Sequence, residues 1–140
     1  MKWLDGSEIN PAEFTGESLC QKLALELFHY DYQNWLACDE CIQDASFLIA
    51  FDTELAMEGI FGFLENSVGQ YAEQVIQAFR KIGDNQDADI LTQICALSEE
   101  EEEKASQLES QLYLNTDFDM WKLLYRYLDE KIESYREELS

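Results

Sequence analysis

The chain has 140 residues, of which 46% are apolar and 28% charged, a composition that suits one ordinary globular domain. Thirty Asp and Glu residues stand against nine Lys and Arg residues, so the net charge is −21. This charge argues against a protein that binds nucleic acid by neutralising phosphates, and against one that docks on an anionic membrane.

Helical spacing of apolar residues runs through most of the chain. Apolar positions that recur by three and four predict helices over residues 19–30, 35–44, 45–64, 71–82, 85–97, 105–114 and 115–139. Asn10-Pro11 predicts an earlier helix start, and the acids Glu99–Glu103 are expected to form a solvated linker or a frayed helix start. No alternation of period two is visible. We therefore expect an all-α fold, a single domain over residues 1–140 built as a bundle of six or seven helices.

Glycines should limit two of these helices. Gly59 and Gly62 fall late in the stretch 45–64 and should kink or end it. Gly83 is a natural C-terminal cap for the stretch 71–82. Asp84 or Asn85 then provides an N-terminal cap for the helix that follows.

The cysteines do not form a recognisable metal or redox motif. Cys38 and Cys41 match Cys-x-x-Cys, but a structural zinc site needs four ligands, and Cys20, Cys95 and His29 are not paired at ligand spacing. The acids between Cys38 and Cys41 should raise the pKa of both thiols, which disfavours reactivity. No apolar run has the length of a signal peptide or a membrane span. We expect reduced, metal-free thiols in a cytoplasmic protein without cofactors.

The charge pattern is more informative than any motif. The chain has no Lys or Arg between Lys22 and Arg80. The acids predicted to form a partner-binding face within this stretch are Asp39, Glu40, Asp44, Asp52, Glu54, Glu58 and Glu65. At 100° per residue, Glu54, Glu58 and Glu65 fall within about 40° of one another on a helix. The alternative interpretation is that the excess charge serves only solubility.

The overall charge density does not by itself imitate a nucleic acid. A folded chain of this size exposes roughly 7,500 Å², or about one acid per 250 Å². Duplex DNA carries one charge per about 1.7 Å of axis, which is roughly one per 105 Å² of its surface. Mimicry of DNA therefore requires the acids to gather on one face.

One segment carries a family pattern. Its sequence is Glu54-Leu-Ala-Met-Glu-Gly59-Ile-Phe-Gly-Phe63-Leu-Glu-Asn66, and it is followed by Ile82-Gly83 and Ala88-Asp-Ile-Leu91. Over roughly residues 44–97 the chain resembles the bacterial DNA-mimic-protein-like family, a domain of unknown function. The positions that match are Glu54, Gly59, Phe63, Asn66, Ile82 and Gly83. The positions that depart are Met57, Glu58 and Gly62, where the family has Asn, Gly and Gln.

The resemblance implies an all-α, non-enzymatic, dimeric protein of the bacterial cytoplasm. At least one family member acts as a DNA mimic that occupies the DNA-binding face of a transcription regulator. The implied partner is a basic DNA-binding protein, with no direct binding to nucleic acid or membrane. An immunity-type inhibitor that caps a nuclease toxin is one alternative, and an enzyme with a carboxylate-based site is another.

Overall fold

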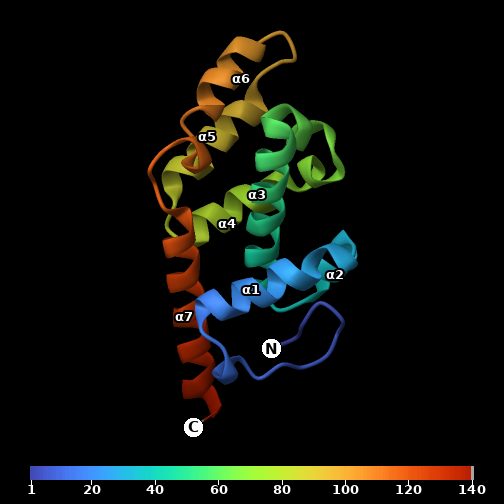
Figure 1. Cartoon of the computed structure of the whole chain (residues 1–140), viewed down its shortest axis with the longest axis vertical. Helices are drawn as coiled ribbons and strands as arrows, with labels where there is room; N and C mark the ends of the chain where they lie inside the picture. Colours follow the sequence, from blue (N-terminus) through green and yellow to red (C-terminus); the bar gives the residue numbers. More distant parts are fainter. Residues whose placement is uncertain (140) are drawn as a thin grey trace. The chain divides into compact units, whose positions relative to one another are not determined.

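The computed structural model describes residues 1–139, apart from the side chains of residues 67, 68 and 139 (Figure 1). Within that range it has seven α-helices, short 3-10 turns and no β-strand, which confirms the predicted all-α fold. The helices are α1 (Gly16–Glu26), α2 (Tyr32–Ala37), α3 (Glu40–Glu65), α4 (Ala72–Lys81), α5 (Asn85–Ala96), α6 (Glu102–Glu109) and α7 (Met120–Leu139). None of these helices is long and apolar enough to cross a membrane.

Local capping explains where the boundaries differ from the prediction. Asn10 does cap a helix, but only the 3-10 turn Pro11–Glu13, and α1 begins later with a capping box between Thr15 and Ser18. The helix predicted over residues 35–44 is divided at Cys38, whose extended ψ of 176° ends α2. Its last residues, from Glu40 on, begin α3, which continues without interruption across the boundary predicted between residues 44 and 45. Asp39 follows Cys38, and its Oδ1 accepts the Cys41 N–H at 3.4 Å, so this acid caps the start of α3.

The chain divides into two compact units, which we describe separately. Unit 1 comprises Met1–Phe47 and Trp121–Ser140, and its helices are α1, α2, the start of α3, and α7. The Gly16 N–H donates to Asp129 Oδ1 at 2.6 Å, which fixes the start of α1 to α7. Leu19, Leu23 and Leu124 are fully buried in the unit. Trp35 packs edge-on against Phe47, with ring centroids 5.7 Å apart.

Unit 2 is the continuous stretch Leu48–Met120, with most of α3 and all of α4, α5 and α6. Phe51 is central to its core and packs edge-on against Phe63 at 4.7 Å and Phe79 at 5.7 Å. Gly83 ends α4 with a φ of 90°, as predicted, and the Asp84 N–H returns to the Phe79 carbonyl. The chain reverses here, so α4 and α5 pack against each other in the unit that also contains the later acids of α3.

Candidate functional site

Helix α3 carries most of the acids predicted to bind a partner. Six of its 26 residues are Asp or Glu and none is Lys or Arg, and Asp39 lies just before it. Asp39, Glu40 and Asp44 belong to unit 1, whereas Asp52, Glu54, Glu58 and Glu65 belong to unit 2. The two groups are therefore described as two clusters.

Asp44 is a buried structural acid. Its side chain is only 4% exposed, and the Tyr127 hydroxyl donates to its Oδ2 at 2.7 Å. Burial raises the pKa of Tyr127, and the hydrogen bond to Asp44 raises it further, so the phenol remains a donor. Asp44 therefore joins α3 to α7 inside unit 1 and presents no carboxylate at the surface.

Asp52 has a similar bond in unit 2. The Tyr113 hydroxyl donates to Asp52 Oδ1 at 2.6 Å, and the Tyr113 backbone N–H donates to Asp87 Oδ1 at 3.0 Å. Burial raises the pKa of Asp52, while the bond from Tyr113 opposes that rise. Asp52 is half-buried, so part of its carboxylate still faces solvent.

Glu54 and Glu58 are brought together, as their helical spacing predicts. Asn66 Nδ2 donates one hydrogen bond to Glu54 Oε2 at 2.8 Å and another to Glu58 Oε2 at 2.9 Å. One neutral amide thus holds two carboxylates side by side that would otherwise repel each other. Glu58 is exposed and Glu54 half-buried, so the pair faces solvent as a set of hydrogen-bond acceptors suited to a guanidinium or an ammonium group.

The position of Glu65 relative to Glu54 and Glu58 is not the one that a straight helix predicts. Gly59 has a φ of 72° and a ψ of −173°, which breaks the helix between Glu58 and Glu65. The N–H of Ile60, freed by the break, donates to Glu109 Oε2 at 2.8 Å. A side chain on Gly59 would also meet that oxygen at 3.2 Å. Glu65 is exposed beyond this break, and the angular count for a straight helix cannot be carried across it.

The family motif therefore has a structural explanation. Glu54 and Asn66 bond to each other, Gly59 makes the break in α3, and Phe63 fills the core of unit 2. Glu109 contacts the motif from 49 positions away, and no sequence signal marked it. The matched residues shape α3, and its exposed acids are the candidate functional groups.

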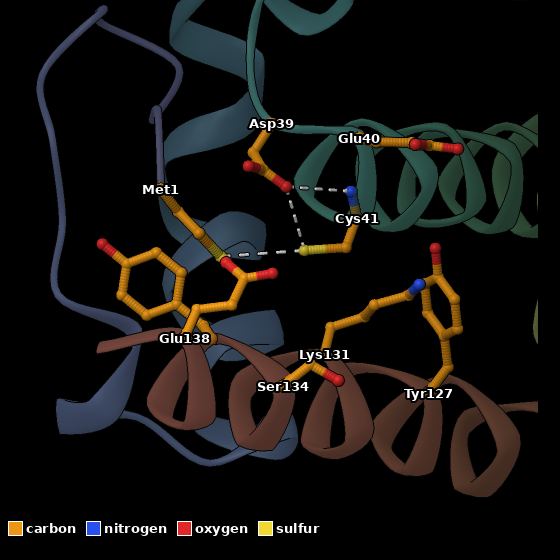
Figure 2. Close-up of a pocket in the computed structure, with 9 residues that line it drawn as sticks. Met1, Asp39, Glu40, Cys41, Tyr127, Lys131, Ser134 and Glu138 are labelled. Atoms are coloured by element: carbon orange, nitrogen blue, oxygen red, sulfur yellow. Dashed lines mark hydrogen bonds between the residues drawn. The ribbon is translucent and has the colours of Figure 1, made fainter. Parts of the chain in front are cut away.

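Unit 1 contains a hollow that sequence reasoning missed. It has a volume of about 390 Å³ and lies between the start of α3 and one face of α7. Figure 2 shows Asp39 and Cys41 on one side and Lys131 on the other, with dashed lines from Asp39 to Cys41 and from Cys41 to Met1. Lys131 lies over the Tyr127 ring, with its Nζ 5.5 Å from the centroid. The hollow is thus lined both by acids and by the base Lys131. The acids are Asp39, Glu40 and Glu138.

The spacing of residues along α7 could have identified the side of the hollow that this helix forms. Tyr127, Lys131, Ser134 and Glu138 recur by three and four, so they share a helix face. Nothing in the sequence places that face opposite Asp39. Because the hollow mixes both signs of charge, it is a weaker candidate for a cationic partner than the acids of unit 2.

The cysteines are thiols without a disulfide. Cys20, Cys38 and Cys41 are buried, and Cys95 is exposed. Burial, together with the charges of the nearby Asp39 and Asp44, raises the pKa of Cys38 to about 12. The Cys38 thiol donates to the Trp35 carbonyl at 2.9 Å. Within residues 1–139, no three His, Cys, Asp or Glu side chains are grouped so as to hold a metal ion.

Comparison with known proteins places the chain in one family. No curated protein and no solved structure matches it. A family model described as DMP19-like protein matches residues 37–140, which extends well beyond the 44–97 stretch where the sequence resemblance is clearest. That match covers the acids of α3, the break at Gly59 and the whole of unit 2, and the chain therefore belongs to the DMP19-like family.

Proposed function

We propose that this protein is a non-enzymatic DNA mimic that occupies the DNA-binding face of a basic partner, such as a transcription regulator. The family resemblance implies this activity. The observation that carries the proposal is the pair Glu54 and Glu58, held together on Asn66 in a helix without a single base. Two neighbouring carboxylates at the surface present negatively charged hydrogen-bond acceptors to a basic side chain, as adjacent phosphates of DNA do.

The surroundings of this pair support the proposal. Unit 2 contains 16 acids and three bases, so its net charge is −13. Among these bases, Arg80 pairs with Asp89 at 2.9 Å and Lys104 pairs with Glu101 at 3.1 Å. The negative potential at the surface of unit 2 is therefore little compensated from within, and it should attract a positively charged DNA-binding face.

Binding of this kind depends strongly on salt. Attraction between exposed charges is screened over about 8 Å at physiological ionic strength. Charge complementarity acts mainly on the association rate, so added salt should slow association more than it speeds dissociation. The partner's contacts with duplex DNA should weaken in the same salt range, because both use the same basic residues.

The test begins with capture of a basic protein from native lysate at low salt, followed by its purification. The purified partner is then titrated with this protein and with duplex DNA together. A DNA mimic and the duplex must exclude each other. A ternary complex of partner, duplex and this protein would contradict the proposal, and so would failure to recover a basic partner at any salt concentration.

Matched variants locate the contact. Glu54→Gln with Glu58→Gln removes two charges but keeps an amide oxygen at each position to accept from Asn66. Asp117→Asn with Asp119→Asn removes two charges from exposed positions elsewhere in unit 2. We expect the first pair to slow association about tenfold and the second pair to have a much smaller effect. Reversal of Glu54, Glu58 and Glu65 to lysine should slow association further, and equal effects of the two matched pairs would exclude this face.

A further inference from the structure

Unit 2 contains a groove that DNA mimicry does not require. It has a volume of about 370 Å³ and lies between the last turns of α3, the end of α5 and helix α6. These three elements belong to the same unit, and Figure 1 shows them near one another. The groove combines an apolar floor with an acidic rim.

The floor includes large apolar side chains that remain partly in water. Phe61 is 39% exposed and Leu64 is 37% exposed, and Leu97, which directly follows α5 and also lines the groove, is half-buried. Exposed apolar residues are common when they occur singly, but here several line one concave surface. Covering them would remove apolar surface from water, which is the main favourable term in protein association.

The rim carries one sign of charge. Glu65, Glu99 and Glu102 line the groove, all three are exposed, and no Lys, Arg or His lies among the lining residues. Glu99 and Glu102 belong to the acidic run expected to be a solvated linker or a frayed helix start, and α6 begins within that run at Glu102. The fold thus brings these two acids to the end of α3 beside Glu65.

We propose that this groove is the docking site for a basic amphipathic segment of the partner, in which an apolar side chain enters the groove and flanking Lys or Arg residues meet the rim. Charge complementarity supports this occupant. A second copy of the chain would bring its own net charge of −21 against the rim. The inference rests on the proposed function for the partner's basic character, and it adds an apolar anchor that phosphate imitation does not supply.

The anchor changes what each part of the surface does. The acids accelerate the encounter, whereas a buried apolar side chain slows dissociation and distinguishes one basic protein from another. Binding should therefore retain a salt-resistant component that depends on the groove. A partner recognised only through its phosphate-binding residues would show no such component.

The probe is a short leucine–lysine peptide whose leucines fall on one face of a helix, with a scrambled peptide of identical composition as its control. Fluorescence anisotropy should show the patterned peptide binding the wild-type protein about tenfold more tightly than the scrambled one. Amide chemical shifts of the wild-type protein should move at Leu64, Leu97 and Ala105, and should stay unchanged at Met57, which is 77% exposed on α3 outside the groove. This measurement needs no variant.

Two matched pairs of variants separate floor from rim. Leu64→Gln should weaken binding of the patterned peptide about tenfold and leave the scrambled peptide unaffected, whereas Met57→Gln should change neither. Glu99→Gln with Glu102→Gln should weaken binding and its salt dependence more than Glu100→Gln with Glu103→Gln does. The second pair removes the same charge from the same acidic run outside the groove.

Three results would overturn the inference. One is equal binding of the two peptides, and another is an equal effect of Leu64→Gln and Met57→Gln. The third is a sedimentation experiment in which the wild-type protein is a dimer and the Leu64→Gln variant is a monomer. That result would assign the groove to a second copy of the chain. None of these results bears on competition with duplex DNA, so the proposed function stands or fails by its own test.

Discussion

The two units of this protein use acidic residues differently. Unit 1 has 14 acids and six bases, a net charge of −8, whereas unit 2 has 16 acids and three bases, a net charge of −13. In unit 1 several carboxylates have defined structural partners. Glu26 accepts from Trp3 and Lys22, Asp44 from Tyr127, and Asp129 from Gly16.

Unit 2 divides its acids between the interior and the surface. Asp84 and Asp87 are buried and Asp52 is half-buried, whereas the Glu54–Glu58 pair and the rim of the groove face solvent. The difference teaches that net charge does not locate a binding face. The exposed acids that remain after the structural ones are set aside are those that a partner can reach.

The largest expected effect tests the coherence of unit 1. A Cβ on Gly16 would overlap the Tyr125 backbone carbonyl, which cannot move away without shifting α7. Gly16→Ala should lower the free energy of unfolding by about 3 kcal/mol, measured by urea denaturation. Gly83→Ala in unit 2 is the comparison, because its Cβ would meet open space and only the φ of 90° is strained. It should cost about 1 kcal/mol, and equal costs would contradict the close approach at Gly16.

The second prediction concerns opposite responses to pH. Burial, a hydrogen bond with Asp84 and the charge of Asp84 together raise the pKa of Asp87 to about 8. Native unit 2 therefore binds this proton more tightly than the unfolded chain, so its stabilisation is complete below the ordinary Asp value of 3.8 and is lost as the pH rises through about 8. In unit 1, burial raises the pKa of Glu26, but hydrogen bonds from Lys22 and Trp3 outweigh it, and the net shift is downward.

The stabilisation from Glu26 is present above its ordinary pKa and is lost as the pH falls through its lowered native value. Asp87→Asn imitates the protonated acid, since its Oδ1 still accepts from Tyr113 and its Nδ2 can donate to the buried carboxylate of Asp84 in place of the acid proton. We expect thermal unfolding of the wild type to shift downward between pH 5 and 8, within the range that the raised pKa of Asp87 sets. The Asp87→Asn variant should lose most of that shift. Asp117→Asn, at an exposed position, should leave it in place.

A third, smaller effect compares the two tyrosine–aspartate bonds. Tyr127→Phe leaves the buried Asp44 without the bond from its hydroxyl, so it should cost about 2 kcal/mol of unfolding free energy. Tyr113→Phe leaves Asp52, which is half-buried and can recruit water, so it should cost about 1 kcal/mol. Denaturant titration of the two variants gives the order. The reverse order would mean that Asp52 is the more dependent acid.

The smallest effect concerns thiol accessibility. Unit 1 holds the three buried cysteines, and unit 2 holds the exposed Cys95. Although Cys95 is exposed, part of its thiol is covered by neighbouring atoms, and this partial desolvation together with the charge of Glu73 raises its pKa. Its reaction with a disulfide reagent should therefore be slow at neutral pH and faster as the pH rises. One thiol should react in the native protein and the other three only on unfolding. Cys95→Ser should abolish the native reaction, and a second reactive thiol would contradict the burial of unit 1.

Much of the fold followed from local sequence signals. Apolar spacing, the cap at Asp84 and the glycine at position 83 are governed by residues a few positions apart, and the structure confirms all three. The division of residues 35–44 was missed because Cys38 carries no helix-breaking side chain. The break at Gly59 was expected as a kink or an end, but its partner Glu109 lies 49 positions away.

The candidate site was less predictable for the same reason. Spacing along α3 does place Glu54 next to Glu58. It cannot show that Asp44 is removed from the surface by Tyr127, which lies 83 positions away. The groove could not be predicted from local sequence signals, because it forms only where the ends of α3 and α5 meet α6.

The bonds made by Asn66 have a consequence for how the protein ages. Asparagine amides hydrolyse slowly to carboxylates, and here that reaction would convert the amide that donates to both Glu54 and Glu58 into a third acceptor. Three carboxylates would then repel one another at a place where two are held together by hydrogen bonds from a neutral amide. One deamidation event would thus loosen the end of α3 while making the chain more acidic, so an older preparation would carry more charge and a less ordered binding face.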